Sequence, residues 1–261
     1  MHATVAVASG KGGVGKSTVA LNLACALAVD GSRVGLLDAD VYGPDIPRMV
    51  NVTRTQAADH IMLAHGPETG PHTLEPIEAF GISIMSIGLM IGEDQPLDWS
   101  SPLVQLLVRR FATDVDWGEI DVLVLDLPPG TADLQQFISA SYRPDGVLLV
   151  VTPQDVAHLD AKKAVAMYER SGIPILGAVE NMATLTCPDC DREIELFPPV
   201  RPERSIWHQG VERLASIPLD PAIAHAADDG RPAVVAHPGS STTNIFHALA
   251  RTVAAKLATG P

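Results

Sequence analysis

The chain has 261 residues, a net charge of −13, an apolar fraction of 46% and an aromatic fraction of only 4%. This length fits one large domain, and an aliphatic core is typical of a parallel sheet covered by helices. The acidic charge without a basic cluster argues against a nucleic-acid-binding surface or an anionic-membrane anchor, and neither a membrane-spanning run nor room for a signal peptide is evident.

Strand-like apolar runs alternate with helix-like runs from end to end of the chain. The predicted strands cover residues 4–8, 33–38, 82–87, 122–126, 147–152, 175–180 and 214–217. The predicted helices cover residues 17–29, 102–113, 131–141, 155–170 and 242–258. This alternation predicts a single α/β domain over residues 1–261, with a mostly parallel twisted sheet and helices on both faces. Ligands of such a fold bind beyond the carboxyl ends of the strands.

A glycine-rich loop joins the first predicted strand to the first predicted helix. Its glycines let backbone N–H groups approach phosphate oxygens, and the helix start adds partial positive charge. Lys16 is expected to reach the β- and γ-phosphates and Ser17 to ligate Mg²⁺. The alternative, a turn that matches the G-x-x-x-x-G-K-[ST] pattern by chance, is disfavoured by the strand–loop–helix setting, so we predict a P-loop NTPase. The residues of the loop are Gly10, Lys11, Gly12, Gly13, Val14, Gly15, Lys16, Ser17 and Thr18.

Two carboxylates, Asp38 and Asp40, follow the second predicted strand. Carboxylates this close repel each other unless a cation or hydrogen-bond donors lie nearby, and a Mg²⁺–triphosphate would supply the positive charge. Asp38 then suits the outer shell of the magnesium, and Asp40 is expected to orient or activate the attacking water. The alternative is that each aspartate caps the turn that follows the strand.

Residues 51–76 interrupt the alternation and are rich in His, Pro, Gly and Thr, which predicts an exposed loop or insertion. The spacing of His60, His65 and His72 defines no ligand geometry, so a solvated loop is favoured over a metal site.

The fourth predicted strand ends in Asp126, and the turn Leu-Pro-Pro-Gly-Thr follows it. A carboxylate after an apolar strand is the Walker B arrangement, in which it faces Mg²⁺ or a water bound to it. The stiff turn is suited to sense the γ-phosphate through the Gly130 N–H. Three phosphate-site motifs in this chain order strongly favour a nucleoside triphosphate site.

The chain has three cysteines, two of them in the Cys-x-x-Cys pair Cys187 and Cys190 at the start of a segment that spans residues 187–207. This pair can bind one soft metal centre, but zinc and iron–sulfur clusters normally take four ligands. Cys25, inside the first helix, is expected to be a packing residue. The simplest completion is a second copy of the chain; a bridging zinc and a thiol–disulfide motif are the alternatives. So few cysteines favour a reducing cytoplasm.

These motifs together resemble the Mrp/ApbC family over residues 4 to about 253. The loop with Lys11 ahead of Lys16 looks like the deviant Walker A loop shared by MinD, ParA, the nitrogenase iron protein and Mrp/ApbC proteins. The stretches Tyr-Gly-Pro-Asp-Ile-Pro, Asp-Leu-Pro-Pro-Gly-Thr and Glu-Asn-Met-Ala-Thr-Leu-Thr-Cys-Pro-Asp-Cys are similar to Mrp/ApbC segments in particular. The chain departs from the family at Ala132, where a glycine is usual, and at 193–202, where a glycine-rich stretch is common.

The resemblance implies that Lys11 crosses a homodimer interface to the partner's nucleotide, where a solvated surface lysine is the alternative. It implies ATP as the nucleotide, with Asn181 bonded to the adenine and Pro218 and Asp220 beside it; Asn181 closing a turn is the alternative. Two copies of the cysteine pair would hold a 4Fe–4S cluster between them.

The implied activity is a slow ATPase that transfers its cluster to apo iron–sulfur client proteins. The rival is a MinD/ParA-like dimerisation switch without a cluster, which has no need of the cysteine pair and commonly carries a membrane helix or a basic DNA surface. A nitrogenase-like electron donor is weaker, because residues 126–133 contain no cysteine. A third possibility is a zinc ion that only staples the dimer.

Overall fold

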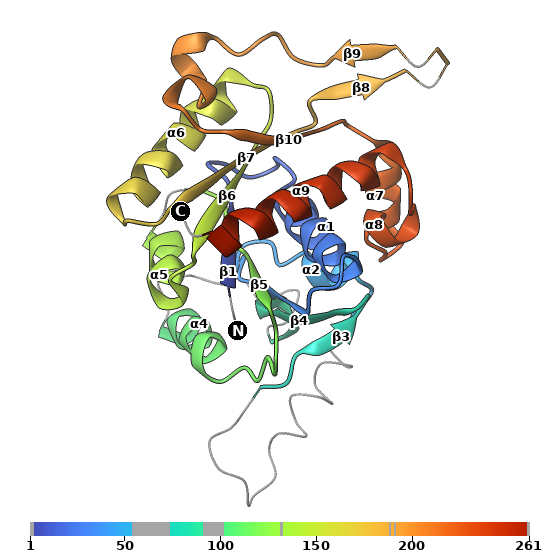
Figure 1. Ribbon diagram of the computed structural model, residues 1–261. Coiled ribbons are helices and arrows are strands. Elements are labelled where there is room, and N and C mark those ends of the chain that lie inside the picture. The colour runs from blue at the N-terminus through green and yellow to red at the C-terminus, as the bar shows by residue number, and fades with distance from the viewer. Residues whose placement is uncertain are drawn as a thin grey trace, which may run out of the picture.

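A twisted β-sheet with helices on both faces forms the protein (Figure 1). The computed structural model describes residues 3–53, 74–90, 102–130, 133–187, 189–190 and 192–259. In these residues the sheet has eight strands in the order β10-β7-β6-β1-β5-β2-β4-β3. All neighbours pair in parallel except β3, which is antiparallel to β4. The strands are β1 Ala3–Ala8, β2 Val34–Asp38, β3 Ile77–Ala79, β4 Ile82–Ser86, β5 Val122–Asp126, β6 Gly146–Val151, β7 Ile175–Asn181 and β10 Arg213–Ile217.

Two hydrophobic clusters fill the space between the sheet and its helices. Successive residues of a strand face opposite sides of a sheet, so Val5 belongs to one cluster and Ala6 to the other. Helices α1, α8 and α9 pack on the first face, and α4, α5 and α6 pack on the second. The helices are α1 Lys16–Val29, α2 Ile46–Met49, α4 Pro102–Thr113, α5 Asp133–Tyr142, α6 Asp155–Arg170, α7 Pro221–Asp228, α8 Ala233–Ala236 and α9 Ser241–Thr259, with short 3₁₀ turns at Ile87–Leu89, Pro202–Arg204 and Trp207–Gln209.

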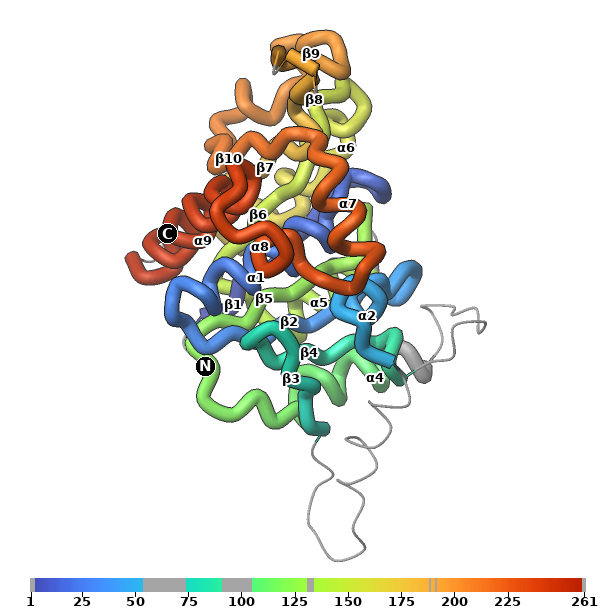
Figure 2. Tube along the Cα trace, turned by 90° about the vertical axis from the view of Figure 1, so that its right-hand side faces the viewer, coloured from blue at the N-terminus to red at the C-terminus, as the bar shows by residue number. Residues whose placement is uncertain are grey.

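A separate two-stranded hairpin leaves the sheet after β7 and lies at one end of the molecule (Figure 2). Its strands are β8, Thr184–Thr186, and β9, Glu193–Glu195, and they pair in antiparallel fashion. All three residues of β9 are exposed, so packing against the body of the protein does not hold this strand. We call residues 184–195 the cysteine hairpin, because Cys187 and Cys190 lie between its two strands.

The predicted parallel sheet with helices on both faces is confirmed, and each predicted strand and helix has a counterpart within one or two residues. The predicted exposed stretch 51–76 ends too late, because Leu74 is buried and pairs with Val115 beside the sheet. His60, His65 and His72 lie outside the described residues. No helix in the described parts of the chain is long and apolar enough to cross a membrane.

Candidate functional site

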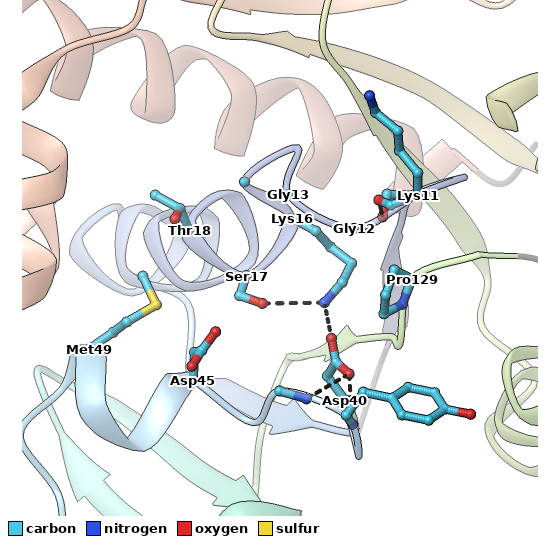
Figure 3. A pocket seen from close by; sticks show the side chains of 14 residues that line it. Lys11, Gly12, Gly13, Lys16, Ser17, Thr18, Asp40, Asp45, Met49 and Pro129 are labelled. Atoms are coloured by element: carbon cyan, nitrogen blue, oxygen red, sulfur yellow. Dashed lines mark hydrogen bonds and ion pairs between the residues drawn. The ribbon is translucent and has the colours of Figure 1, made fainter. Parts of the chain in front are cut away.

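The carboxyl ends of three neighbouring strands, β1, β5 and β2, meet beneath the glycine-rich loop. The sheet register places Asp126 beside both Val7 and Asp38, so two buried carboxylates lie side by side at this edge. Above them is a pocket of about 380 Å³ (Figure 3). The pocket is lined by Ser9, Lys11, Gly12, Gly13, Gly15, Lys16, Ser17, Thr18, Asp40, Tyr42, Gly43, Asp45, Met49 and Pro129.

Lys16 is the cation at the centre of this site. Its Nζ lies 2.6 Å from Asp126 Oδ1, 3.3 Å from Asp40 Oδ2 and 3.2 Å from Ser17 Oγ. Burial by itself lowers the pKa of Lys16, but the nearby carboxylates of Asp126, Asp40 and Asp38 outweigh it and the pKa is raised. Lys16 therefore stays protonated and supplies a fixed positive charge to the pocket.

Asp126 and Asp38 are fully buried, and burial raises the pKa of both carboxyl groups. Asp38 accepts a 2.8 Å hydrogen bond from Ser86 Oγ and a 3.2 Å bond from the Asp40 N–H. Asp126 Oδ2, in contrast, is buried and has no hydrogen-bond partner among the described residues. Carboxylate and hydroxyl oxygens are the ligands that Mg²⁺ prefers, so the orphaned oxygen and the nearby Ser17 hydroxyl fit this ion.

The two carboxylate oxygens of Asp40 have different partners. Its Oδ1 accepts hydrogen bonds from the N–H groups of Tyr42 and Gly43 at 3.1 and 3.3 Å, so it does cap the turn after β2. Its Oδ2 faces Lys16 inside the pocket. The turn-capping alternative and a position beside a bound phosphate are therefore compatible, and the role of Asp40 toward a water molecule stays a prediction.

Close packing explains two of the loop's glycines, Gly10 and Gly15. A Cβ at Gly10 would overlap the backbone of Asp160 in α6, and one at Gly15, where φ is 81°, would overlap the Asn181 amide. The first turn of α1 has no side-chain cap, so its N–H groups are free of side-chain acceptors. Uncapped helix N–H groups beside a loop rich in glycine form a cradle that fits phosphate oxygens.

Lys11 points away from Lys16 and Asp40 (Figure 3). Its Nζ donates a 3.0 Å hydrogen bond to Oε1 of Gln154, which also accepts a 3.2 Å bond from Thr152 Oγ1. The sequence did not reveal Gln154 as the partner, because a Gln just before a helix carries no distinctive signal. The Gly130 N–H, predicted to sense a γ-phosphate, donates to the carbonyl of Ser9 at 2.9 Å.

None of the three residues predicted to bind adenine is among the residues that line the phosphate pocket, although Asn181 contacts the glycine-rich loop. Asn181 is buried, and its Nδ2 donates a 2.8 Å hydrogen bond to the carbonyl of Val14. Ile217 pairs with Asn181, which places Pro218 just beyond the same edge of the sheet. Asp220 caps α7 through Ala222 N and also accepts from Thr242 Oγ1. Their role toward adenine stays a prediction.

The cysteine hairpin presents two free thiols. Cys190 is exposed, Cys187 is half-buried, and Cys25 is buried in the core as expected. Hydrogen bonds from the Asp189 N–H and from the thiol and N–H of Cys190 lower the pKa of Cys187, which favours the thiolate that metals bind. Burial raises the pKa of Cys25 to about 12, which makes it inert. Within the described ranges no group of three or more His, Cys, Asp or Glu side chains is placed to hold a metal ion, and the role of the cysteine pair toward a metal stays a prediction.

A glycine-rich loop between a parallel strand and a helix, a buried lysine and carboxylates at the ends of adjacent strands define a P-loop nucleotide-binding protein. The ParA family model, described as the NUBPL iron-transfer P-loop NTPase, matches residues 1–254. The chain belongs to this family.

Relatives and one solved structure agree with that assignment. The chain is 42% identical to an iron–sulfur cluster carrier protein from Helicobacter pylori over 97% of this chain and 67% of the relative. It is 41% identical to an Arabidopsis thaliana mitochondrial iron–sulfur protein required for NADH dehydrogenase, over 95% of this chain and 77% of the relative. A nucleotide-binding protein from Archaeoglobus fulgidus, solved in complex with ADP, superposes with a TM-score of 0.74 at 33% identity and covers 94% and 92% of the two chains.

Proposed function

We propose that this protein is an ATP-hydrolysing iron–sulfur cluster carrier that holds a 4Fe–4S cluster between two copies of the chain and delivers it to apo client proteins. The observation that carries the proposal is the pair of free thiols on the cysteine hairpin, in a chain that also has a phosphate-binding loop. Relatives named as cluster carriers and a neighbour in complex with ADP support it. Because free thiols persist in a reducing compartment, we propose the cytoplasm as its location.

The polar residues of the nucleotide site are assigned different roles in binding and hydrolysis of ATP. We assign Lys16 to the β- and γ-phosphates of ATP, and Ser17, Asp38 and Asp126 to Mg²⁺, directly or through water. Mg²⁺ would neutralise the charge that develops on the transferred phosphoryl group. Asp40, 3.3 Å from Lys16, is the group we assign to the attacking water. Hydrolysis is expected to be slow without a partner, because a switch needs a persistent ATP state.

The cluster site is complete only in a dimer. Cys187 and Cys190 supply two thiolates, and a 4Fe–4S cluster takes four. A twofold axis beside the cysteine hairpin would bring the second pair from the other copy. Lys11 gives a second reason for a dimer. Among the described residues its Nζ bonds the neutral Gln154 at 3.0 Å and forms no ion pair with a carboxylate, and a partner's phosphates would supply a negative charge.

Replacement of Cys187 by alanine tests whether the cysteine pair holds an iron–sulfur cluster. After anaerobic reconstitution the parent is expected to contain about two iron and two sulfide per chain, the share of a 4Fe–4S cluster held by a dimer, whereas Cys187→Ala should contain almost none. Metal and acid-labile sulfide analysis with absorbance spectra provide the readout.

Cys25→Ala is the matched control, because this thiol is buried away from the hairpin and its loss should leave loading unchanged. A colourless parent that binds only zinc, or no metal, would overturn the carrier. The remaining candidate would then be an ATP-dependent dimerisation switch.

Replacement of Lys11 by alanine tests whether this lysine is needed for the ATP-dependent dimer. With ATP and Mg²⁺ the parent is expected to shift toward a dimer in light scattering, and Lys11→Ala should stay monomeric because the charge that bridges to the partner's nucleotide is lost. ATP should still bind, since Lys16 remains in place. Lys163→Ala, which removes an exposed lysine of α6, should dimerise like the parent. A Lys11→Ala protein that dimerises as well as the parent would refute the bridging role.

A further inference from the structure

The first turns of α6 support the glycine-rich loop. Gly10 packs so closely on this helix that a Cβ would lie 2.5 Å from the backbone nitrogen of Ala161. Lys11 is bonded to Gln154, the residue immediately before the helix. A displacement of the loop therefore acts directly on the start of α6, because close-packed backbone leaves no slack to absorb it.

The carboxylate of Asp155, the first residue of α6, holds the chain that follows the cysteine hairpin. Its Oδ2 lies 2.9 Å from Arg204 Nη1 and 3.3 Å from Arg201 Nε, and its Oδ1 accepts a 3.0 Å bond from the Arg201 N–H. Three donors from one short segment thus converge on one side chain. Asp155 is the residue next to Gln154, so Lys11 and these arginines are bonded to consecutive residues.

Two further contacts hold the same segment along one face of α6. The Ile206 N–H donates to Nδ1 of the buried His158 at 3.3 Å, and the His158 and Trp207 rings meet edge to face with centroids 5.3 Å apart. Lys162 Nζ donates a 2.6 Å bond to the Glu203 carbonyl. Positions 155, 158 and 162 fall on one helix face, and Figure 1 shows the segment after β9 beside α6.

The chain that leads into the cysteine hairpin is also joined to the glycine-rich loop. Asn181 donates to the Val14 carbonyl at 2.8 Å, and β8 begins at Thr184, only three residues later. Met182 between them has a φ of 55°, a backbone conformation that is costly for a side chain of this kind. Both ends of the hairpin therefore connect to the loop, one through Asn181 and the other through α6.

We propose that Asp155 is a positioning residue that couples the nucleotide site to the cysteine pair. By holding Arg201 and Arg204 at the start of α6, it makes the exit of the cysteine hairpin follow the helix end on which Lys11 and Gly10 rest. A change in the loop on nucleotide binding then alters the setting of Cys187 and Cys190. This inference rests on the proposed nucleotide site, and the coupling element is the α6 N-terminus, which both Lys11 of the glycine-rich loop and the segment after the cysteine hairpin contact.

The test measures thiol reactivity, which needs no cluster. In reduced, cluster-free, full-length protein the reaction of Cys187 and Cys190 with dithionitrobenzoate is followed with and without Mg²⁺ and a non-hydrolysable ATP analogue. We expect the analogue to change the parent's rate by about fivefold, the lower end of usual coupling between two sites. In Asp155→Asn the change should fall to less than about twofold. Analogue affinity should be that of the parent, because Asp155 does not line the phosphate pocket.

Three variants sharpen the result. Arg204→Gln removes the arginine side of the contact and should lose the change in thiol reaction rate. Asp155→Glu should keep much of that change, because its carboxylate can still accept from both arginines. Glu169→Gln makes the same charge change in the last turn of α6, about 21 Å further along the helix, and should respond like the parent.

Two outcomes would overturn the coupling. In one, the analogue changes the thiol reaction rate of folded Asp155→Asn as much as that of the parent. In the other, the bound analogue leaves the thiol reaction rate of the parent unchanged. Neither touches the proposed function, which depends on analogue binding and on iron and sulfide content. If the analogue does not bind the parent at all, the proposed nucleotide site is refuted, and the coupling with it.

Discussion

Lys16→Ala is expected to lower the affinity for ATP by at least about 100-fold, because hydrogen bonds to charged groups contribute about 1.5–3 kcal/mol each and every 1.4 kcal/mol is tenfold. Lys16 is the buried cation of the pocket, and the loss of its charge also leaves the triphosphate among the carboxylates of Asp126, Asp40 and Asp38. Calorimetric titration with Mg²⁺–ATP provides the measurement. Lys163→Ala, an exposed lysine, is the control and should bind as the parent does.

The same variant has a second, less obvious consequence in protein without added nucleotide. Removal of the Lys16 ammonium leaves buried carboxylates without a cation, and a broken buried ion pair costs about 3–5 kcal/mol. The pKa of Asp126 and that of Asp38, already raised by burial, should rise further. A carboxyl group whose pKa is raised by folding stabilises the folded state below its unfolded pKa and loses that contribution as the pH rises through the folded pKa.

The stability of Lys16→Ala should therefore fall, relative to the parent, as the pH rises from about 5 to 8, above the ordinary carboxyl pKa near 4. Denaturant unfolding at the two pH values measures this difference. An equal deficit at both values would mean that the carboxylates are not what destabilises the variant, and unchanged ATP affinity would refute the assignment of the site.

The features that local sequence could predict are the ones that occupy contiguous residues. The glycine-rich loop, the strand that ends in Asp126 and the pair Cys187 and Cys190 each carry their chemistry within a few positions. Parallel pairing then brings strand ends to one edge, so the meeting of Asp38 and Asp126 followed from the fold class. The principal strands and helices were predictable for the same reason, since their apolar periodicity is local.

What the sequence could not predict depends on tertiary register. Ser86 bonds Asp38 because β4 pairs with β2, and Gln154 receives Lys11 because α6 lies under the loop. Neither residue type nor spacing marks such partners. The shortest elements, such as α2, β3 and the strands of the cysteine hairpin, were also not predicted, because three or four residues carry too little periodicity.

The stretch that departs from the Mrp/ApbC pattern gains a physical meaning from the structure. Residues 193–202 replace the usual glycine-rich run, and they include Arg201, whose N–H and guanidinium both contact Asp155. A flexible run would leave the exit of the hairpin loosely placed, because glycine loses more conformational freedom on ordering than other residues. Arg201 instead holds the end of the segment on α6, and the neighbouring prolines restrict its backbone, which favours a hairpin that follows this helix.

Gly10→Ala is expected to destabilise the folded protein and to weaken nucleotide binding together. The new Cβ would overlap the Asp160 backbone and lie 2.5 Å from the Ala161 nitrogen. Because these are backbone atoms, either the helix or the loop must shift to make room. Overpacking of this kind costs about 1–3 kcal/mol, which for a chain of this size lowers the melting temperature by roughly 2–12 °C. A loop displaced from α6 no longer presents its N–H groups in one cradle, so the affinity for ATP should fall at least about tenfold.

Gly12→Ala is the matched control, because it makes the same substitution two residues away in the same loop. The nearest atom to its Cβ would be Pro129 Cγ at 3.9 Å, an ordinary contact, and no positive φ opposes the substitution. Its melting temperature should equal that of the parent or rise slightly, since alanine reduces the freedom of the unfolded chain. Equal melting temperatures for the two variants would show that the loop does not rest on α6. The connection from Gly10 through α6 to Arg201 and the cysteine hairpin would then lose its first contact.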